Sequence, residues 1–272
     1  LQSRPIGQQV HHFEFDYSAS PLTCKAETMT VRACANADCS QRFTDPVTAQ
    51  LSINPNTNGA WYVGGVNSPS LNFVNGLATA ALRYNVTAPA VTIGVSSSIP
   101  STVAGSNTLC RKGSGSLNTA SCTLAFADSG FIFDVPDKLA NKPTSINISA
   151  VRKSNSSLEC VPAFSDATKN VGFWSSYITP SSIPAAWQQA TTIKGNPSSP
   201  SPTVIGKTES TRTPIPVKFT NGVASVEVNY PDAGKVELSA RLDGVGEDMG
   251  LVMIGSDQFV SVPAGLCVKP VD

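Results

Sequence analysis

Apolar residues in this chain alternate with polar ones, which is the two-residue period of β-strands buried on one face. The period recurs in short runs along the whole length: Phe13/Phe15/Tyr17, Met29/Val31/Ala33, Val47/Ala49/Leu51/Ile53, Val91/Ile93/Val95, Ile146/Ile148/Ala150, Ile215/Val217/Phe219 and Val226/Val228/Tyr230. Helical periodicity is nearly absent. Short strands separated by turn residues are typical of sandwiches rather than of α/β layers. The pattern therefore predicts an all-β protein.

The second half of the chain repeats the first half in the same order. The strongest match is the turn Asn75-Gly76, which recurs as Asn221-Gly222 with a Phe two residues upstream and a Tyr eight residues after the Gly. Asn-Gly between apolar runs favours a type I′ hairpin, because both central residues need positive φ. Two further matches lie upstream: Phe13–Asp16 with Phe131–Asp134, and Cys39–Asp45 with Cys160–Asp166. Ordered matches of this kind indicate a duplicated domain.

We therefore predict two tandem immunoglobulin-like β-sandwich domains, residues 1–127 and 128–272. The second is longer because of an expected loop insertion at about 180–214, whose Pro-rich stretch 196–202 cannot form a ladder strand. Residues 257–263 faintly echo residues 128–131, which suggests the start of a third repeat after residue 258.

Seven cysteines indicate an oxidising compartment, because two pairs of them are spaced as clips across short loops. The predicted disulfides are Cys34–Cys39 and Cys110–Cys122. The alternative is a set of unrelated buried thiols. The partners of Cys24, Cys160 and Cys267 stay open: either Cys267 bonds to Cys160, or its partner belongs to residues outside this sequence.

Charge narrows the range of partners. Charged residues make up only 14% of the 272 residues, and Lys+Arg and Asp+Glu balance at 19 each. Phosphate binding needs an excess of Lys and Arg, so a nucleic-acid partner is excluded. No run of 18 apolar residues occurs, so we expect no membrane span. Leu1–Pro5 does not resemble a signal peptide, and we expect that one was removed or that the chain is part of a longer precursor.

Four stretches carry a family resemblance: Leu22–Cys24, Val31–Cys39, Phe126–Phe131 and Asn229–Gly234. They resemble the MSHA pilus biogenesis protein MshQ family, large surface proteins encoded with the mannose-sensitive haemagglutinin type IV pilus of marine Gram-negative bacteria. The resemblance runs through nearly the whole chain, as an internal segment of a longer protein. It implies an extracellular, pilus-associated or adhesin-like role. It supplies no catalytic residues.

Catalytic chemistry finds little support in the sequence. The only histidines, His11 and His12, are adjacent, and no phosphate loop, dinucleotide fingerprint or Gly-x-Ser-x-Gly occurs. We therefore predict no enzyme, no catalytic residue and no organic cofactor. A glycosidase-like pair of carboxylates stays open, because any two of the 19 acids can meet in space.

One acidic loop is a candidate calcium site. Asp243, Glu247 and Asp248 lie within six residues together with two glycines, and carboxylate oxygens are the ligands that Ca²⁺ prefers. The spacing is not that of an EF-hand. The alternative is a solvated turn between strands, which we favour.

Three aromatic residues are candidates for ligand binding. Trp61 and Tyr62 lie among Gly and Asn residues, and Trp187 lies in the expected insertion. Flat rings on loops are common anchors for sugars and protein partners. A sandwich also keeps a Trp between its sheets, and we expect Trp174 to be that core residue.

Together these features predict a non-catalytic extracellular module, secreted or on the cell surface, that acts in attachment or as a structural stalk. The expected partners are other pilus or surface proteins, host or environmental glycans, and further domains of its own precursor. The alternative is a carbohydrate-binding module or an accessory domain of a secreted polysaccharide-active enzyme.

Overall fold

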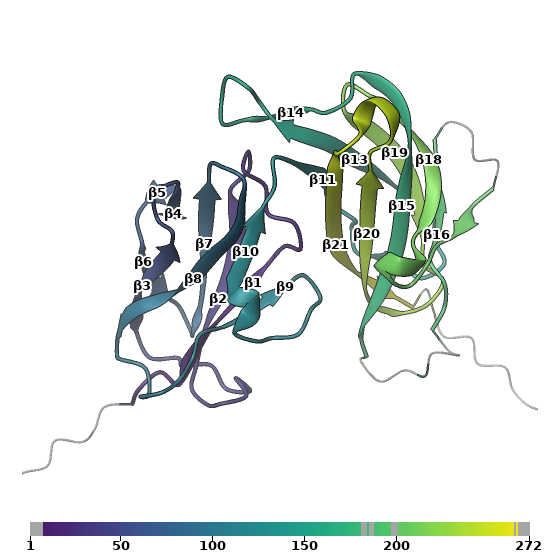
Figure 1. Cartoon of the computed structure of the whole chain (residues 1–272). Helices are drawn as coiled ribbons and strands as arrows, with labels where there is room; N and C mark the ends of the chain where they lie inside the picture. Colours follow the sequence, from purple (N-terminus) through teal and green to yellow (C-terminus); the bar gives the residue numbers. More distant parts are fainter. Residues whose placement is uncertain (1–7, 181–183, 185–187, 197–200, 264, 266–272) are drawn as a thin grey trace, which may run out of the picture. The chain divides into compact units, whose positions relative to one another are not determined.

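The computed structural model describes residues 8–180, 184, 188–196, 201–263 and 265 (Figure 1). Within these ranges the regular structure is β-strand, apart from three 3₁₀ turns of three residues each. Nothing in the described part of the chain is a helix of the length and apolarity needed to cross a membrane. The chain forms two compact units, one made of Leu1–Asp128 with Ser156–Glu159 and the other of Ser129–Asn155 with Cys160–Asp272. Each unit is all-β and has its own hydrophobic core, so the predicted tandem β-sandwich is confirmed.

The first unit is a sandwich of two sheets. The larger sheet has the order β5-β4-β7-β2-β1-β9 and the smaller one the order β10-β8-β3-β6. The strands of the larger sheet are β1 (His12–Tyr17), β2 (Glu27–Cys34), β4 (Gly59–Val63), β5 (Val66–Asn67), β7 (Leu77–Tyr84) and β9 (Leu109–Lys112). Those of the smaller sheet are β3 (Val47–Asn54), β6 (Ser70–Phe73), β8 (Ala88–Ile99) and β10 (Thr123–Phe126), the last preceded by η1 (Ala120–Cys122).

The second unit is one continuous sheet that folds over itself. Its order is β11-β13-β19-β18-β15-β20-β21-β12. These strands are β11 (Ser129–Phe133), β12 (Lys138–Leu139), β13 (Thr144–Lys153), β15 (Asp166–Thr179), β18 (Thr213–Thr220), β19 (Val223–Asn229), β20 (Gly234–Asp243) and β21 (Val252–Val262). Three short strands lie beside this path: β14 (Cys160–Pro162) pairs with β13, and β16 (Thr192–Lys194) pairs with β17 (Thr203–Val204) and β19. Two 3₁₀ turns, η2 (Glu209–Thr211) and η3 (Gly246–Asp248), connect strands.

The residues of the predicted alternation face the two cores. Phe13 and Phe15 of β1 are at most 1% exposed, and Phe219 of β18 is fully buried in the second unit. Intervening residues such as Thr28 and Lys218 point outward. Because side chains of a strand alternate between faces, the polar positions are free to carry surface chemistry without disturbing the cores.

The two Asn-Gly turns occupy equivalent places, as the repeat predicts. Asn75, Gly76, Asn221 and Gly222 all have φ between 51° and 76°. The strands that leave the turns pair in the same way: Ala78 of β7 lies opposite Val31, and Ala224 of β19 lies opposite Ile148. In each unit the turn glycine accepts a backbone hydrogen bond from an alanine amide, Ala33 in the first and Ala150 in the second. The duplication therefore extends to register.

Two expectations about the second unit need correction. The segment 180–214 is not simply a loop, because β16 pairs with β19 in the position that β4 takes beside β7 in the first unit. Its residues 181–183, 185–187 and 197–200 lie outside the described part. Residues 258–262 belong to β21, and Phe259 is fully buried in the second core. These residues complete the second unit instead of opening a third repeat.

Both predicted disulfides are present. Cys34 bonds to Cys39 and Cys110 bonds to Cys122, each with a Cα–Cα distance of 4.9 Å. Cys24 and Cys160 are disulfide-bonded as well. Cys267 lies outside the described residues. Oxidised cysteines in a chain of this size agree with folding in an oxidising compartment.

A buried carboxylate fixes the connection between β1 and β2. Glu27 is 7% exposed, and it accepts hydrogen bonds from the Ser18 amide at 2.6 Å and the Ser18 hydroxyl at 2.9 Å. Burial raises the pKa of Glu27, and the two bonds from Ser18 offset this only in part. The folded state therefore favours the protonated carboxyl, although the charged form receives two donors.

The turn glycines yield a first prediction. Gly222→Ala should lower the free energy of unfolding by at least about 2 kcal/mol, because a left-handed backbone is costly for Ala and the new Cβ lies 2.7 Å from Cβ of Pro162. Gly105→Ala is the matched control, since Gly105 has φ of 80° and open space around it. It should lose only about 1 kcal/mol. Urea unfolding measures both, and equal losses would contradict the packing argument.

A second prediction concerns pH. Because the folded-state pKa of Glu27 lies above its usual 4.5, its contribution to stability is fully present at low pH and declines as pH rises through the folded pKa. The difference in unfolding free energy between Glu27→Gln and the wild type should therefore rise with pH above about 4.5. Urea unfolding at several pH values between 4 and 8 tests this. A difference that is flat or falls with pH would refute the assignment.

Candidate functional site

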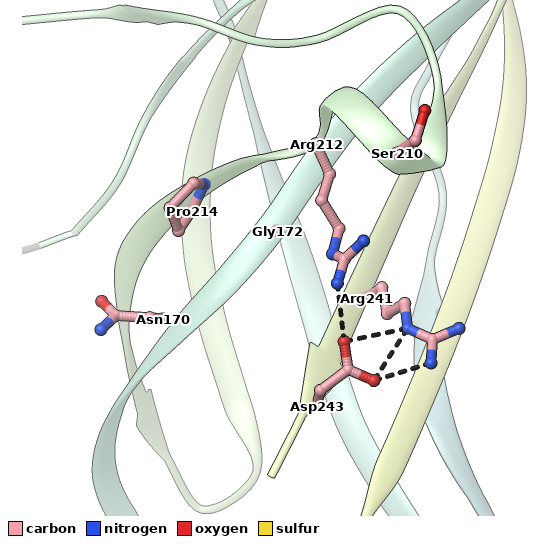
Figure 2. A pocket seen from close by; sticks show the side chains of 7 residues that line it. All are labelled: Asn170, Gly172, Ser210, Arg212, Pro214, Arg241 and Asp243. Carbon is pink, nitrogen blue, oxygen red and sulfur yellow. Dashed lines mark hydrogen bonds and ion pairs between the residues drawn. The ribbon is translucent and has the colours of Figure 1, made fainter. Parts of the chain in front are cut away.

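A groove of about 410 Å³ lies on the outer face of the second unit, across β15, β18 and β20 (Figure 2). Seven residues line it: Asn170, Gly172, Ser210, Arg212, Pro214, Arg241 and Asp243. A second hollow of about 540 Å³ shares Ser210, Arg212 and Arg241 with it and adds Thr208 and Glu209. The two hollows together form what we call the arginine groove.

Strand register brings these residues together. Gly172 of β15 lies opposite Pro214 of β18 on one side and opposite Arg241 of β20 on the other. Arg212 immediately precedes β18, so its side chain starts at the edge of this row. A Cβ on Gly172 would lie 2.7 Å from Cδ of Arg212. Glycine at this position therefore lets the Arg212 side chain cross β15 close to the sheet.

Two guanidinium groups bind one carboxylate at the floor of the groove (Figure 2). Arg241 donates from Nε to both oxygens of Asp243, at 2.9 and 3.1 Å, and from Nη2 to Oδ1 at 2.7 Å. Arg212 donates from Nη2 to Oδ2 of Asp243 at 2.9 Å. Forked contacts of this kind hold a guanidinium in a fixed plane. Asp243 thus fixes the plane of the Arg241 guanidinium and holds Arg212 by one hydrogen bond.

A second carboxylate closes the network from the rim. Glu209 accepts a hydrogen bond from Nη1 of Arg241 at 2.7 Å, and its backbone carbonyl accepts one from Nη1 of Arg212 at 2.9 Å. Glu209 opens η2, where the hydroxyls of Thr208 and Thr211 and the backbone amides of both residues form a capping box. Its side chain is 50% exposed, twice the value for Arg241. The rim carboxylate is therefore the looser partner of Arg241.

Asp243 and Arg241 stabilise each other's charged forms. Hydrogen bonds from Arg241, followed by its positive charge and that of Arg212, lower the pKa of Asp243 despite some desolvation. Hydrogen bonds to Asp243 and Glu209 raise the pKa of Arg241 above its already high value. A carboxylate held this way does not release or take up a proton near neutral pH. The groove is suited to holding a ligand rather than to acid–base chemistry.

The predicted calcium ligands do not gather at one point. Asp243 is bound by the two arginines, and Asp248 forms an ion pair with Lys169. Glu247 is exposed in η3. Within the described residues the three acids do not form a cluster of ligand atoms. Lysine and arginine side chains already neutralise two of the acids in this loop.

The aromatic candidates are placed differently from the prediction. Trp61 is 3% exposed and packs 6.2 Å from Phe15, centroid to centroid, so it is a core residue and not a surface anchor. The alternation of β4 accounts for this, since it turns Trp61 inward and leaves its neighbour Tyr62 half-buried. Trp187 lies outside the described residues. Trp174 is buried, as expected, although the adjacent Phe173 is the residue enclosed in the second core.

One cluster with metal-ligand chemistry occurs in the first unit. Nε2 of His12 lies 3.3 Å from Oε1 of Glu14, and Cys34 lies on the neighbouring strand. Cys34 is consumed by its disulfide with Cys39, which leaves two ligand residues. Both are also at most 4% exposed, and Glu14 pairs with Arg32. The cluster is a buried ion network.

Sequence reasoning identified one member of the groove, Asp243, and assigned it to calcium. It missed Arg212, Arg241 and Glu209, which lie up to 32 positions apart and belong to no motif. Strand pairing alone brings these residues together, so no local sequence signal could have identified them.

The two tandem β-sandwiches define a protein of immunoglobulin-like architecture, and models of known protein families match it. A family model described as "Domain of unknown function (DUF6701), first Ig-like domain" matches residues 107–256, more than half of the sequence, and the chain belongs to this family. A second model, the domain of unknown function DUF8613, matches residues 10–101. No curated protein is similar enough to count as a relative.

Several solved structures match this chain at low identity and with low TM-scores. The D0-D1 domain of intimin has 15% identity and a TM-score of 0.32, with 92% of this chain and 96% of that chain covered. The Yersinia pseudotuberculosis adhesin InvE has 11% identity and a TM-score of 0.25, with 92% and 58% covered. A family 123 glycoside hydrolase from Clostridium perfringens has 12% identity and a TM-score of 0.24, with 51% and 24% covered. Likenesses of this size do not define a function.

The close approach at Gly172 gives a third prediction. Gly172→Ala should displace the Arg212 side chain and break its bond to Asp243, because the new Cβ would lie 2.7 Å from Cδ of Arg212. Gly94→Ala is the control, since its Cβ would make an ordinary contact at 3.5 Å. NMR spectra of the arginine side-chain N–H groups report the change. An unaltered Arg212 signal in Gly172→Ala would contradict the packing described here.

Proposed function

We propose that this chain is a non-catalytic extracellular module, secreted or displayed on a cell surface, that acts by presenting rigid β-sheet surfaces. The observation that carries the proposal is the combination of two immunoglobulin-like sandwiches with oxidised cysteines. Disulfides persist in oxidising compartments, and sandwich modules of this size are common in surface proteins. The neutral, charge-poor composition agrees with this role, because it limits unspecific electrostatic attraction.

Two side chains with possible catalytic chemistry, His12 and Asp243, are engaged in other contacts. His12 is buried beside Glu14, where a substrate cannot reach it. Asp243 is bound by two arginines and has a lowered pKa, so it does not serve as a general acid. A retaining or inverting glycosidase needs one carboxyl that is protonated at working pH. Asp243, with its lowered pKa, is not such a group.

The finer proposal is that the module belongs to a pilus-associated surface protein or adhesin. It rests on the resemblance to the MshQ family, carried by stretches such as Val31–Cys39 and Asn229–Gly234. In this role the module acts in surface attachment or as a structural stalk, with pilus or other surface proteins and with further domains of its precursor as partners.

A second candidate function is a carbohydrate-binding module or an accessory domain of a secreted polysaccharide-active enzyme. The arginine groove favours it, since an open hollow that presents arginine, asparagine and serine side chains on a sheet face suits a saccharide. The buried position of Trp61 weighs against a site built on an aromatic platform.

A fourth prediction tests the function. Antibodies against this chain should label intact cells of the source organism, and deletion of the coding region should reduce attachment to surfaces while the growth rate is unchanged. The purified chain should release no reducing ends from a panel of polysaccharides. Labelling only after cell lysis, or measurable hydrolysis, would refute the proposal.

A further inference from the structure

We infer that the arginine groove binds a saccharide that carries a carboxylate, a uronate. In the free protein the Glu209 side chain occupies the position of the ligand's carboxylate, and the ligand displaces it. The inference rests on the proposed function, because a module that acts by presenting a surface needs a site of recognition. It concerns the same face of the second unit, between η2, the middle of β15 and the end of β20.

The two carboxylates of the arginine groove, Asp243 and Glu209, differ in the number of hydrogen bonds that hold them. Asp243 receives four hydrogen bonds from Arg212 and Arg241, although its side chain is 42% exposed. Glu209 receives one from Nη1 of Arg241, and its side chain is 50% exposed. Exposed single-contact ion pairs are weak. Glu209 can therefore turn to solvent while the forked contact with Asp243 keeps the plane of Arg241 in position.

The net charge of the arginine groove would change when the Glu209 side chain turns away. Two guanidinium and two carboxylate groups balance in the groove. Without Glu209 the site would carry one net positive charge, with Nη1 of Arg241 unsatisfied and facing the hollow. A preorganised arginine is well suited to bind a planar carboxylate. An external carboxylate would take the position of the internal one.

The pairing of β15 on both sides favours a saccharide over an acidic peptide as the ligand. The groove lies in the interior of a sheet, where β15 is paired on both sides and offers no free edge for an extended peptide to join. Recognition must come from side chains. Asn170, Ser210 and Thr208 provide amide and hydroxyl groups beside the arginines, and Pro214 provides a small apolar surface. This set matches a ring that carries hydroxyls and one carboxylate.

The experiment measures binding of tetragalacturonate to the whole purified chain by calorimetry, with the methyl-esterified tetramer and a tetraglutamate peptide as comparison ligands. Glu209→Gln removes the internal carboxylate and should tighten binding of tetragalacturonate by about two- to fivefold. Asp166→Asn is the matched control, since it removes an acid from an exposed ion pair with Lys218 at 3.3 Å and should change nothing. Arg212→Gln should weaken binding by about tenfold or more.

The outcomes separate the alternatives. Equal binding of the methyl ester would overturn the role of the carboxylate, and equal binding of tetraglutamate would overturn the choice of a saccharide. The inference is also refuted if Glu209→Gln behaves as Asp166→Asn does, or if neither the wild type nor Glu209→Gln binds tetragalacturonate. Release of reducing ends during titration would instead refute the proposed non-catalytic function, whereas a lack of binding without hydrolysis leaves that function standing.

Discussion

The left-handed Asn-Gly turn is the constraint on which the rest of the second unit depends. Gly222 fits only without a side chain, because its φ is 76° and Pro162 and Ala150 crowd it. The turn sets where β18 ends, and β18 in turn pairs with β15 so that Pro214 lies opposite Gly172. A slip of one residue would move every side chain of β18 to the other face. Arg212 would then no longer lie over Gly172, and the arginine groove would not form.

Much of the fold was predictable from the sequence, for reasons that lie in local chemistry. The alternation at Phe13 and Phe15 and the Asn-Gly turns report backbone geometry directly, and these features fixed the strands, the duplication and the all-β class. The disulfides Cys34–Cys39 and Cys110–Cys122 were accessible because each closes a short loop. These predictions depend on neighbours in the chain.

The remainder depended on contacts between distant segments. Trp61 was expected on a loop because Gly and Asn surround it, but the alternation of β4 turns it into the core. β16 was hidden in a Pro- and Ser-rich stretch whose composition indicates a loop. The arginine groove joins Arg212 to Arg241 and Asp243 through strand register alone, and no local pattern records such a pairing.

One experiment tests directly whether the molecule recognises a ligand without transforming it. A crystal structure of the chain with tetragalacturonate should show an intact tetramer with one carboxylate at Nη1 of Arg241, Asp243 unmoved, and the Glu209 side chain turned to solvent. A cleaved saccharide would contradict the account, as would a tetramer bound elsewhere while the contact between Arg241 and Glu209 is kept.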